Sequence, residues 1–214
     1  GATRDPLKAA TIIHDEASRM TRMVENLTDL ARMEAGQLKM ALNPLDIGAL
    51  TRNVARNLAV TAEKKGVILN VSASQLPSIN GDGDRLVQAL NNLIGNALKF
   101  TPPSGVVNVR AQTSGDGVEI SVSDTGVGIP EKDLSRIFER FYQVDKVRPP
   151  ERGTGLGLAI THEIISAHGG TISVSSKEGA GTTFTVWLPM LNKSRGKTST
   201  MTRPRVSVDT ATDD

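Results

Sequence analysis

The stretch from Asp84 to Thr101 carries Asn92, Asn96 and Lys99 at intervals of four and three residues. The apolar residues of this stretch return every three or four positions, which predicts a helix with one buried face. On such a helix Asn92, Asn96 and Lys99 lie along roughly one side, because residues three or four apart are surface neighbours. Amide oxygens and a lysine suit a magnesium ion that bridges phosphates. A buried helix with polar residues on its solvent side would show the same spacing, so both interpretations stay open here.

A second candidate is the sequence D-T-G-V-G-I, which begins at Asp124 and closes a predicted strand. Gly126 and Gly128 would let the backbone pass close to a flat ligand. Asp124, if buried at the strand end, could accept a hydrogen bond from an exocyclic amine such as that of adenine. An Asp followed by a glycine two residues later is also ordinary turn chemistry.

The third candidate is G-T-G-L-G-L, which begins at Gly153 and leads into a predicted helix. Closely spaced glycines at a helix start offer free N–H groups and the positive end of the helix dipole, which together bind anions. The sequence is not a P-loop, because G-x-x-x-x-G-K-[ST] does not occur. It is not a dinucleotide fingerprint either, because Leu158 stands where the third glycine belongs. A flexible hinge would not explain three alternating glycines.

Composition excludes several classes of function. The 214 residues contain no cysteine, which excludes disulfides, thiolate metal sites and a cysteine nucleophile. The net charge of +2, without basic residues alternating with aromatic ones, gives no indication of nucleic-acid binding. No apolar run approaches the length of a membrane span, and the N-terminus lacks the apolar core of a signal peptide. We therefore expect a cytoplasmic fragment without membrane contact, any membrane anchor lying in a longer parent protein.

The elements that must position these residues follow from periodicity. In residues 6–35 apolar positions recur about every three and a half residues, as in a coiled coil or helical bundle. This spacing predicts one long helix. Hairpins dominate the remainder, which predicts an α+β fold with two layers, a mixed and mostly antiparallel sheet packed against helices. A polar stretch at 143–152 is typical of a mobile lid. Further helices are expected near 47–65, 84–101, 131–141 and 156–167, and strands near 67–74, 106–113, 118–124, 171–176 and 182–188.

Together with I-F-E-R-F-Y (137–142) and G-T-T-F (181–184), the three motifs resemble sensor histidine kinases of two-component systems, in the order found in that family. The resemblance covers about residues 6–189. It implies that residues 1–38 are the second helix of a truncated dimerisation and histidine-phosphotransfer domain. Residues 44–190 would be the catalytic ATP-binding domain of the GHKL group, and residues 191–214 a disordered tail.

The resemblance implies ATP and Mg²⁺ as cofactors, with Asn96 as the metal ligand. It implies catalytic roles near the phosphates for Asn92, Lys99 and Arg140. Asp124 would bind the adenine amine, and the glycine-rich segment would close over the phosphates. The residues expected to contact the nucleotide are Asn92, Asn96, Lys99, Asp124, Gly126, Gly128, Ile129, Phe138, Arg140, Phe141, Gly153, Thr154, Gly155, Leu156, Gly157, Leu158 and Thr182.

The implied reaction moves the γ-phosphate of ATP to a histidine, within a homodimer of the full-length parent, for relay to an aspartate of a response regulator receiver domain. ATP-hydrolysing members of the GHKL group carry a glutamate one helical turn before the metal-binding asparagine, where it acts as general base. Here that position is Asn92, whose neutral amide accepts a proton poorly. The sequence therefore favours transfer over hydrolysis.

A phospho-accepting histidine is expected in an H-E-x-x-x-P-L setting, which does not occur. His14 lies in the stretch that resembles the second dimerisation helix, and His162 and His168 are expected to be structural. We therefore expect the fragment alone to bind Mg–ATP without autophosphorylating. One alternative is a non-catalytic nucleotide-binding regulatory or interaction module on the same fold. The other is a structural dimerisation fragment, against which the intact Asn96, Lys99 and Asp124 argue.

Overall fold

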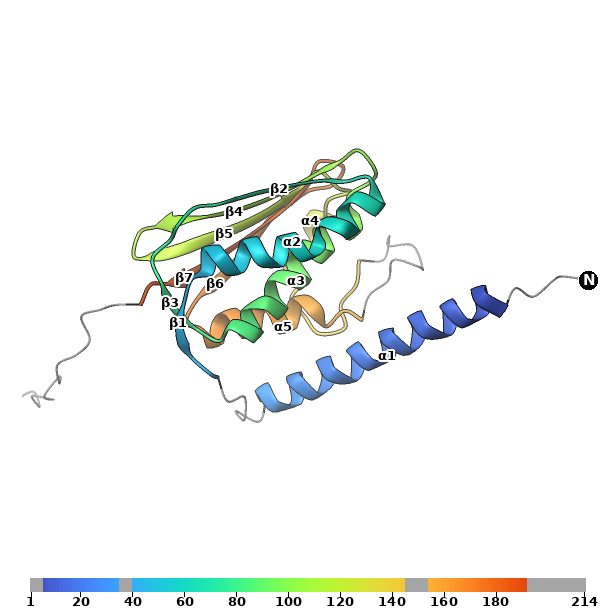
Figure 1. The fold of residues 1–214 in the computed structure, drawn as a ribbon, viewed down its shortest axis with the longest axis horizontal. Helices are drawn as coiled ribbons and strands as arrows, with labels where there is room; N and C mark the ends of the chain where they lie inside the picture. Colours follow the sequence, from blue (N-terminus) through green and yellow to red (C-terminus); the bar gives the residue numbers. More distant parts are fainter. Residues whose placement is uncertain (1–5, 35–39, 145–153, 192–214) are drawn as a thin grey trace, which may run out of the picture.

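A computed structural model describes residues 6–34, 40–144 and 154–191. Its elements, in chain order, are α1 (Pro6–Glu34), β1 (Asn43–Leu45), α2 (Ile47–Lys65), β2 (Ile68–Ala73), β3 (Ile79–Gly81), α3 (Gly83–Phe100), β4 (Val106–Ser114), β5 (Gly117–Asp124), α4 (Glu131–Leu134), α5 (Gly157–Ala167), β6 (Thr171–Lys177) and β7 (Gly181–Pro189). Helices and a sheet form two layers (Figure 1). The expected α+β class is confirmed. The tail expected at 191–214 and the lid expected at 143–152 fall largely outside the described residues.

The main sheet has five strands in the order β2-β4-β5-β7-β6. Only the β2–β4 pair is parallel, and the β4–β5, β5–β7 and β6–β7 pairs are antiparallel. The mixed, mostly antiparallel sheet is therefore confirmed. A second, two-stranded sheet pairs β1 with β3. Neither of these three-residue strands was expected, because so few residues show no alternation, and the segment of β1 was interpreted as an extended link.

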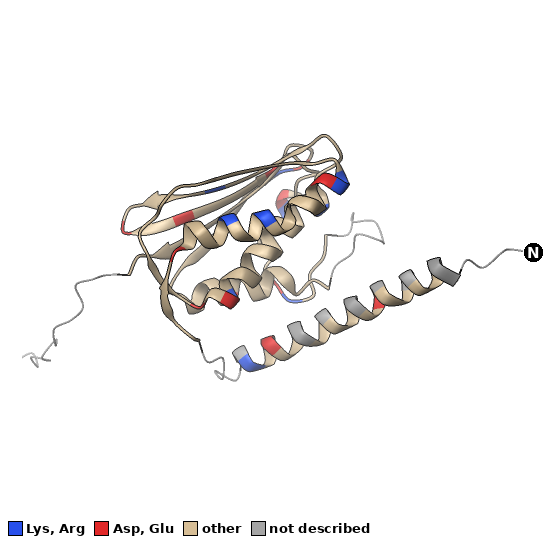
Figure 2. Ribbon diagram, in the orientation of Figure 1, with Lys and Arg blue, Asp and Glu red and all other residues tan. Residues whose placement is uncertain are grey.

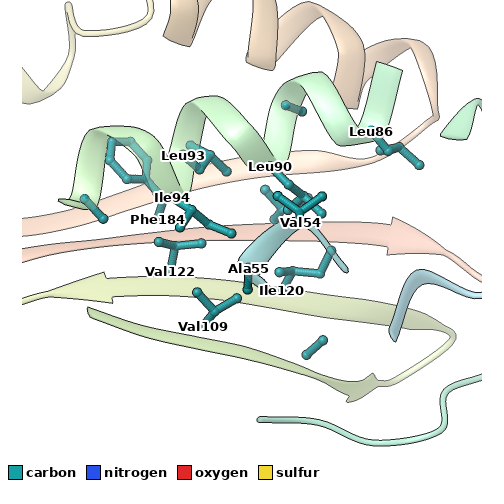
Figure 3. Packing of buried hydrophobic residues seen from close by; sticks show 14 of the residues in the cluster. Val54, Ala55, Leu86, Leu90, Leu93, Ile94, Val109, Ile120, Val122 and Phe184 are labelled. Carbon is teal, nitrogen blue, oxygen red and sulfur yellow. The ribbon is translucent and has the colours of Figure 1, made fainter. Parts of the chain in front are cut away.

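The helices α2, α3 and α5 cover one face of the main sheet (Figure 1). Leu90, Leu93 and Ile94 of α3 lie over Val122 and Phe184 of the sheet (Figure 3). The charged residues of α3 occur only in its first and last turns, so its middle is uncharged (Figure 2). Burying this apolar face holds α3 against the sheet.

Capping groups define the ends of α2 and α3. Asp46 accepts the N–H of Ala49 at 2.8 Å, and Gly66 ends α2 with a φ of +66°; both were expected from the sequence. Asp82 caps α3 by accepting the N–H of Arg85 at 3.2 Å. Lys65 donates to the carbonyl groups of Leu98 and Lys99 at 2.8 and 2.7 Å. The last turn of α3 therefore has partners for carbonyls that a helix end leaves unpaired.

The prediction of a helix over 131–141 is wrong beyond Leu134, where α4 ends. After Leu134 the chain continues as tight turns, in which Arg136 N–H donates to Asp133 and Glu139 N–H donates to Arg136, both at i→i−3. Phe141 has a φ of +61°, which no α-helix contains. The phenol of Tyr142 donates to Asp133 at 2.7 Å. These contacts turn the chain back on α4, so apolar spacing alone did not predict the path.

The long helix α1 lies against α5 and also makes a polar contact with α3. Asp29 accepts hydrogen bonds from Arg85 at 2.6 Å and from Gln88 at 3.0 Å, both on α3. Ile13, Met20 and Val24 of α1 are exposed, so this part of its apolar stripe is uncovered. Within the described ranges, no helix combines the length and apolarity that a membrane span requires.

Candidate functional site

Helix α3 brings the three sequence motifs together. In its middle, Asn92 contacts the start of α5, where a Cβ on Gly157 would overlap the Asn92 carbonyl oxygen. At its end, the carbonyl of Phe100 accepts the N–H of Val127 at 3.3 Å, from the loop that follows Asp124. One helix therefore touches both the D-T-G-V-G-I loop and the glycine-rich segment. These segments are separated in the sequence by more than twenty residues.

The two asparagines form the polar centre of the site. The amide nitrogen of Asn92 donates to the hydroxyl of Thr161 at 2.9 Å. The amide nitrogen of Asn96 lies 3.5 Å from the carbonyl oxygen of Asn92. Within the part of the chain that the structure describes, the Asn96 carbonyl oxygen accepts no hydrogen bond. It therefore retains the acceptor capacity that a cation would use.

Asp124 ends β5, and the residue is only 9% exposed. Its Oδ1 accepts the backbone N–H of Gly126 at 2.8 Å and that of Thr182 at 3.3 Å. Burial raises the pKa of Asp124 above its ordinary value, and the two N–H groups offset this effect only in part. Both hydrogen bonds end on Oδ1, so Oδ2 has no such partner among the described residues. Oδ2 is the atom that can accept an amine from a ligand.

The loop after Asp124 needs its glycines for close backbone approach. A Cβ on Gly128 would overlap the carbonyl of Lys177, and Gly128 has a φ of +69°, which favours glycine. The N–H of Ile129 donates to Ser176 at 2.8 Å. The Ser176 hydroxyl also lies 2.9 Å from the hydroxyl of Thr182. These bonds tie the loop to the β6–β7 hairpin, in which Thr182 contacts both Ser176 and Asp124.

The glycine-rich segment is described from Thr154, and Gly153 lies outside the described residues. Gly155 has a φ of +72°, and its carbonyl accepts the N–H of Phe141 at 2.9 Å. The Thr154 hydroxyl accepts the N–H of Leu156 at 3.3 Å. Leu156 is fully buried, and Leu158 packs against the core. The two leucines anchor the segment, while Gly157 starts α5 beside Asn92.

Four other residues were expected to contact the nucleotide, namely Lys99, Phe138, Arg140 and Phe141. The amine of Lys99 lies 4.8 Å from the centroid of the Phe100 ring. Phe138 packs its ring against His162 and Phe184, at centroid distances of 5.7 and 6.4 Å. Arg140 is exposed, and Phe141 is 56% exposed. The expected roles of these four residues at the nucleotide therefore stay predictions.

Sequence reasoning missed Thr161 and Ser176. Thr161 lies one turn into α5 and bonds Asn92 of α3, while Ser176 of β6 links Ile129 with Thr182. Neither lies in a segment whose pattern indicates a site. Both act through partners far away in the sequence, which local spacing does not reveal.

The oxygen atoms of the site suit a hard cation such as Mg²⁺ that is held partly by the phosphates of a nucleotide. Among the described residues there is no group of three or more His, Cys, Asp or Glu side chains that could hold a metal. The Asn96 carbonyl oxygen remains as a neutral oxygen donor. Mg²⁺ takes few protein ligands and completes its octahedron with phosphate oxygens and water. The site therefore suits Mg²⁺ that arrives with a nucleotide rather than alone.

Comparison with known proteins gives one family match. The family described as histidine kinase-, DNA gyrase B-, and HSP90-like ATPase matches residues 81–192, which include Asn92, Asp124 and Gly157. This range begins at the end of β3 and runs past β7. It contains every expected site residue.

Curated relatives are sensor kinases of greater length. The circadian input-output histidine kinase CikA of Synechococcus elongatus is 36% identical over 190 residues, which are 87% of this chain and 25% of that protein. The sensor histidine kinase ZraS of Escherichia coli K12 is 39% identical over 182 residues, 85% of this chain and 37% of that protein. The chain thus spans well under half of either kinase.

Solved structures also match most of this chain. Full-length ShkA in complex with AMPPNP superposes with a TM-score of 0.75 at 35% identity, covering 86% of this chain and 38% of that one. The catalytic domain of the histidine kinase ThkA, in a nucleotide-free form, superposes with a TM-score of 0.62 at 27% identity. It covers 71% of this chain and 97% of that one.

Proposed function

Because the chain belongs to the histidine kinase-, DNA gyrase B- and HSP90-like ATPase family, whose model matches more than half of it, we propose that it is the ATP-binding catalytic portion of a sensor histidine kinase. In this proposal it binds Mg–ATP and presents the γ-phosphate to a histidine on a partner helix. The phosphate then passes to an aspartate of a response regulator receiver domain.

One observation carries the proposal. Helix α3 contacts the start of α5 through Asn92 and the Asp124 loop through Phe100. An adenine-binding carboxylate and a phosphate-binding segment are thereby held on one helix that also carries Asn96. In this proposal one nucleotide bridges these parts, from Asp124 to the glycine-rich segment.

The chemistry assigned to each residue follows from its atoms. Asp124 Oδ2 would accept the adenine amine, and the Asn96 carbonyl oxygen would be a ligand of Mg²⁺. When bound, the metal neutralises phosphate charge, which is much of what phosphoryl transfer requires. Lys99 and Arg140 would supply further positive charge near the phosphates. Asn92 is a neutral amide and a poor general base, which supports transfer to a protein group over attack by water.

The proposal extends to the parts of the chain and to its partners. Residues 1–38 would be the second helix of a dimerisation domain, with 44–190 as the catalytic domain and 191–214 as a tail. The exposed apolar residues of α1 support this division, since a helical hairpin would cover them. The parent would act as a homodimer in the cytoplasm, where its ATP and its response regulator are found.

Calorimetric titration with AMPPNP, with and without Mg²⁺, tests the proposal. The wild type should bind saturably and more tightly with Mg²⁺, and Asn96→Ala should lose most of the gain from Mg²⁺. A control is Asn108→Ala, which changes an exposed amide on strand β4 and should bind as the wild type does. Failure of the wild type to bind under both conditions would refute nucleotide binding.

Phosphotransfer needs its own assay. The chain is mixed with γ-labelled ATP and with a separately produced helical hairpin that carries the phospho-accepting histidine. Acid-labile label should accumulate on the hairpin and not on this chain. Tight AMPPNP binding without transfer to any such hairpin would favour the non-catalytic regulatory module instead.

A further inference from the structure

We propose that Thr161 is a positioning residue, which orients the amides of Asn92 and Asn96 for the magnesium–nucleotide complex. The inference rests on the proposed function and assigns a residue of α5 to a role in the same site. Thr161 is 1% exposed, so it does not contact a nucleotide directly. It acts through Asn92, whose side chain spans the space between α3 and α5.

The single hydrogen of the Thr161 hydroxyl determines which way the Asn92 amide faces. The Thr161 hydroxyl has a single hydrogen, which it donates to the carbonyl of Gly157 at 2.9 Å. Toward Asn92, at 2.9 Å, the hydroxyl can therefore only accept. The group of Asn92 that faces Thr161 must then be its NH₂ group. Its carbonyl oxygen is directed away from Thr161, toward Gly157 and Asn96.

The orientation passes on to Asn96 by the same logic. Because the carbonyl oxygen of Asn92 faces Asn96, it can accept a hydrogen bond from the Asn96 NH₂ group, which lies 3.5 Å away. Asn96 then keeps its own carbonyl oxygen for a cation. If Asn92 turned over, two NH₂ groups would face each other, and Asn96 would have to turn as well. The NH₂ group of Asn96 would then stand where its carbonyl oxygen was available to the metal, and the partly positive hydrogens of an NH₂ group repel a cation.

The start of α5 is shaped around this arrangement. A Cβ on Gly157 would overlap the carbonyl oxygen of Asn92, so only glycine leaves room for the oxygen there. Gly157 thus accepts the Thr161 hydroxyl and makes space for the group that this hydroxyl orients. Groups that hold a metal ligand in its orientation typically change metal affinity by ten- to a hundredfold when removed.

The test uses Thr161→Val and Thr161→Ser on the whole chain. Valine replaces the hydroxyl with a methyl group at nearly equal volume, whereas serine keeps the hydroxyl. The measured quantity is the ratio of the AMPPNP Kd without Mg²⁺ to the Kd with Mg²⁺. Thr161→Val should reduce this ratio about tenfold and leave the Mg²⁺-free Kd unchanged. Thr161→Ser should keep the wild-type ratio.

A second readout is independent of nucleotide. In the ligand-free protein, the side-chain NH₂ resonances of Asn92 should shift in Thr161→Val and remain in Thr161→Ser, because only serine keeps the acceptor. If the valine variant does not fold, Thr161→Ala and Thr161→Ser form the comparison, since they differ by one hydroxyl. A folded variant without the hydroxyl that keeps the wild-type ratio overturns the inference.

These outcomes separate this inference from the proposed function. A wild type that binds no AMPPNP overturns both. A wild type with a clear Mg²⁺ dependence, which Thr161→Val leaves intact, overturns only the role of Thr161. Equal loss of affinity with and without Mg²⁺ also overturns it, because that result indicates a structural role of Thr161 in packing α5 against α3.

Discussion

His168, at the end of α5, accepts the backbone N–H of Asp82 at 2.9 Å through Nε2. Its Nδ1 lies 2.7 Å from the carbonyl of Ile164. Since Nε2 accepts a hydrogen bond, the ring is neutral and its one proton is on Nδ1. Asp82 in turn caps α3, which carries the site. The imidazole therefore connects the end of one site helix to the start of the other.

Replacing His168 should destabilise the protein without touching the nucleotide directly. His168→Ala leaves the Asp82 N–H buried without an acceptor and opens a space in the packing. We expect a loss of about 2–3 kcal/mol in the free energy of unfolding, measured by urea denaturation. His162→Ala is the matched control, since His162 is exposed, and it should change stability by less than half as much. Equal losses would contradict this account.

Asp124 should show opposite effects of one substitution on stability and on binding. Its raised pKa means that the fold disfavours the ionised form, so its contribution to stability increases as the pH falls through that raised pKa toward the ordinary value of 3.8. Asp124→Asn removes the charge, so at pH 7 the melting temperature should stay equal or rise. AMPPNP affinity should fall about tenfold or more, the worth of a hydrogen bond to a charged group. A large loss of melting temperature would show that Asp124 is needed for folding instead.

The sequence alone predicted the parts of this protein that depend on local patterns. Apolar spacing located α3, and Asp46 and Gly66 predicted the ends of α2. The motif residues Asn92, Asp124 and Gly157 were found in the same way. Each of these signals is carried by neighbours in the chain.

Contacts between distant residues were not predictable. The three-residue strands β1 and β3 exist only because they pair with each other. The left-handed Phe141 follows from its bond to Gly155, and spacing had suggested a helix there. Thr161 has a role only because Asn92 faces it from another helix. Tertiary contacts decided each of these cases.

Gly157 and Gly95 should respond oppositely to alanine. Gly157→Ala puts a Cβ onto the Asn92 carbonyl oxygen, which must move, and overpacking of this kind costs about 1–3 kcal/mol. Gly95→Ala, in the middle of α3, meets nothing within 4 Å and should stabilise the helix by about 0.5–1 kcal/mol. Thermal unfolding measures both, and calorimetry should show weaker Mg–AMPPNP binding for Gly157→Ala only. Weaker binding by Gly95→Ala would mean that the open space beside Gly95 belongs to the nucleotide.

The contact between α1 and α3 should depend on a single carboxylate. The Arg85–Asp29 pair at 2.6 Å is partly buried, with side chains 23% and 15% exposed. Burial raises the pKa of Asp29, but hydrogen bonds from Arg85 and Gln88 outweigh it and leave the pKa below its ordinary value. The contact should therefore persist above pH 3.8 and weaken as the pH falls through the lower pKa of the folded protein.

Removing the guanidinium should release α1 at neutral pH as well. Arg85→Ala leaves Asp29 with Gln88 alone, and we expect the distance between α1 and α5 to become broadly distributed. The chain has no cysteine, so Ala17→Cys and Ala167→Cys, both at exposed positions, accept spin labels for a pulsed distance measurement. Glu139→Gln is the control, because it breaks an exposed pair with Arg136 at 3.2 Å away from α1. A narrow distribution in Arg85→Ala would show that apolar packing, and not this pair, holds α1 in place.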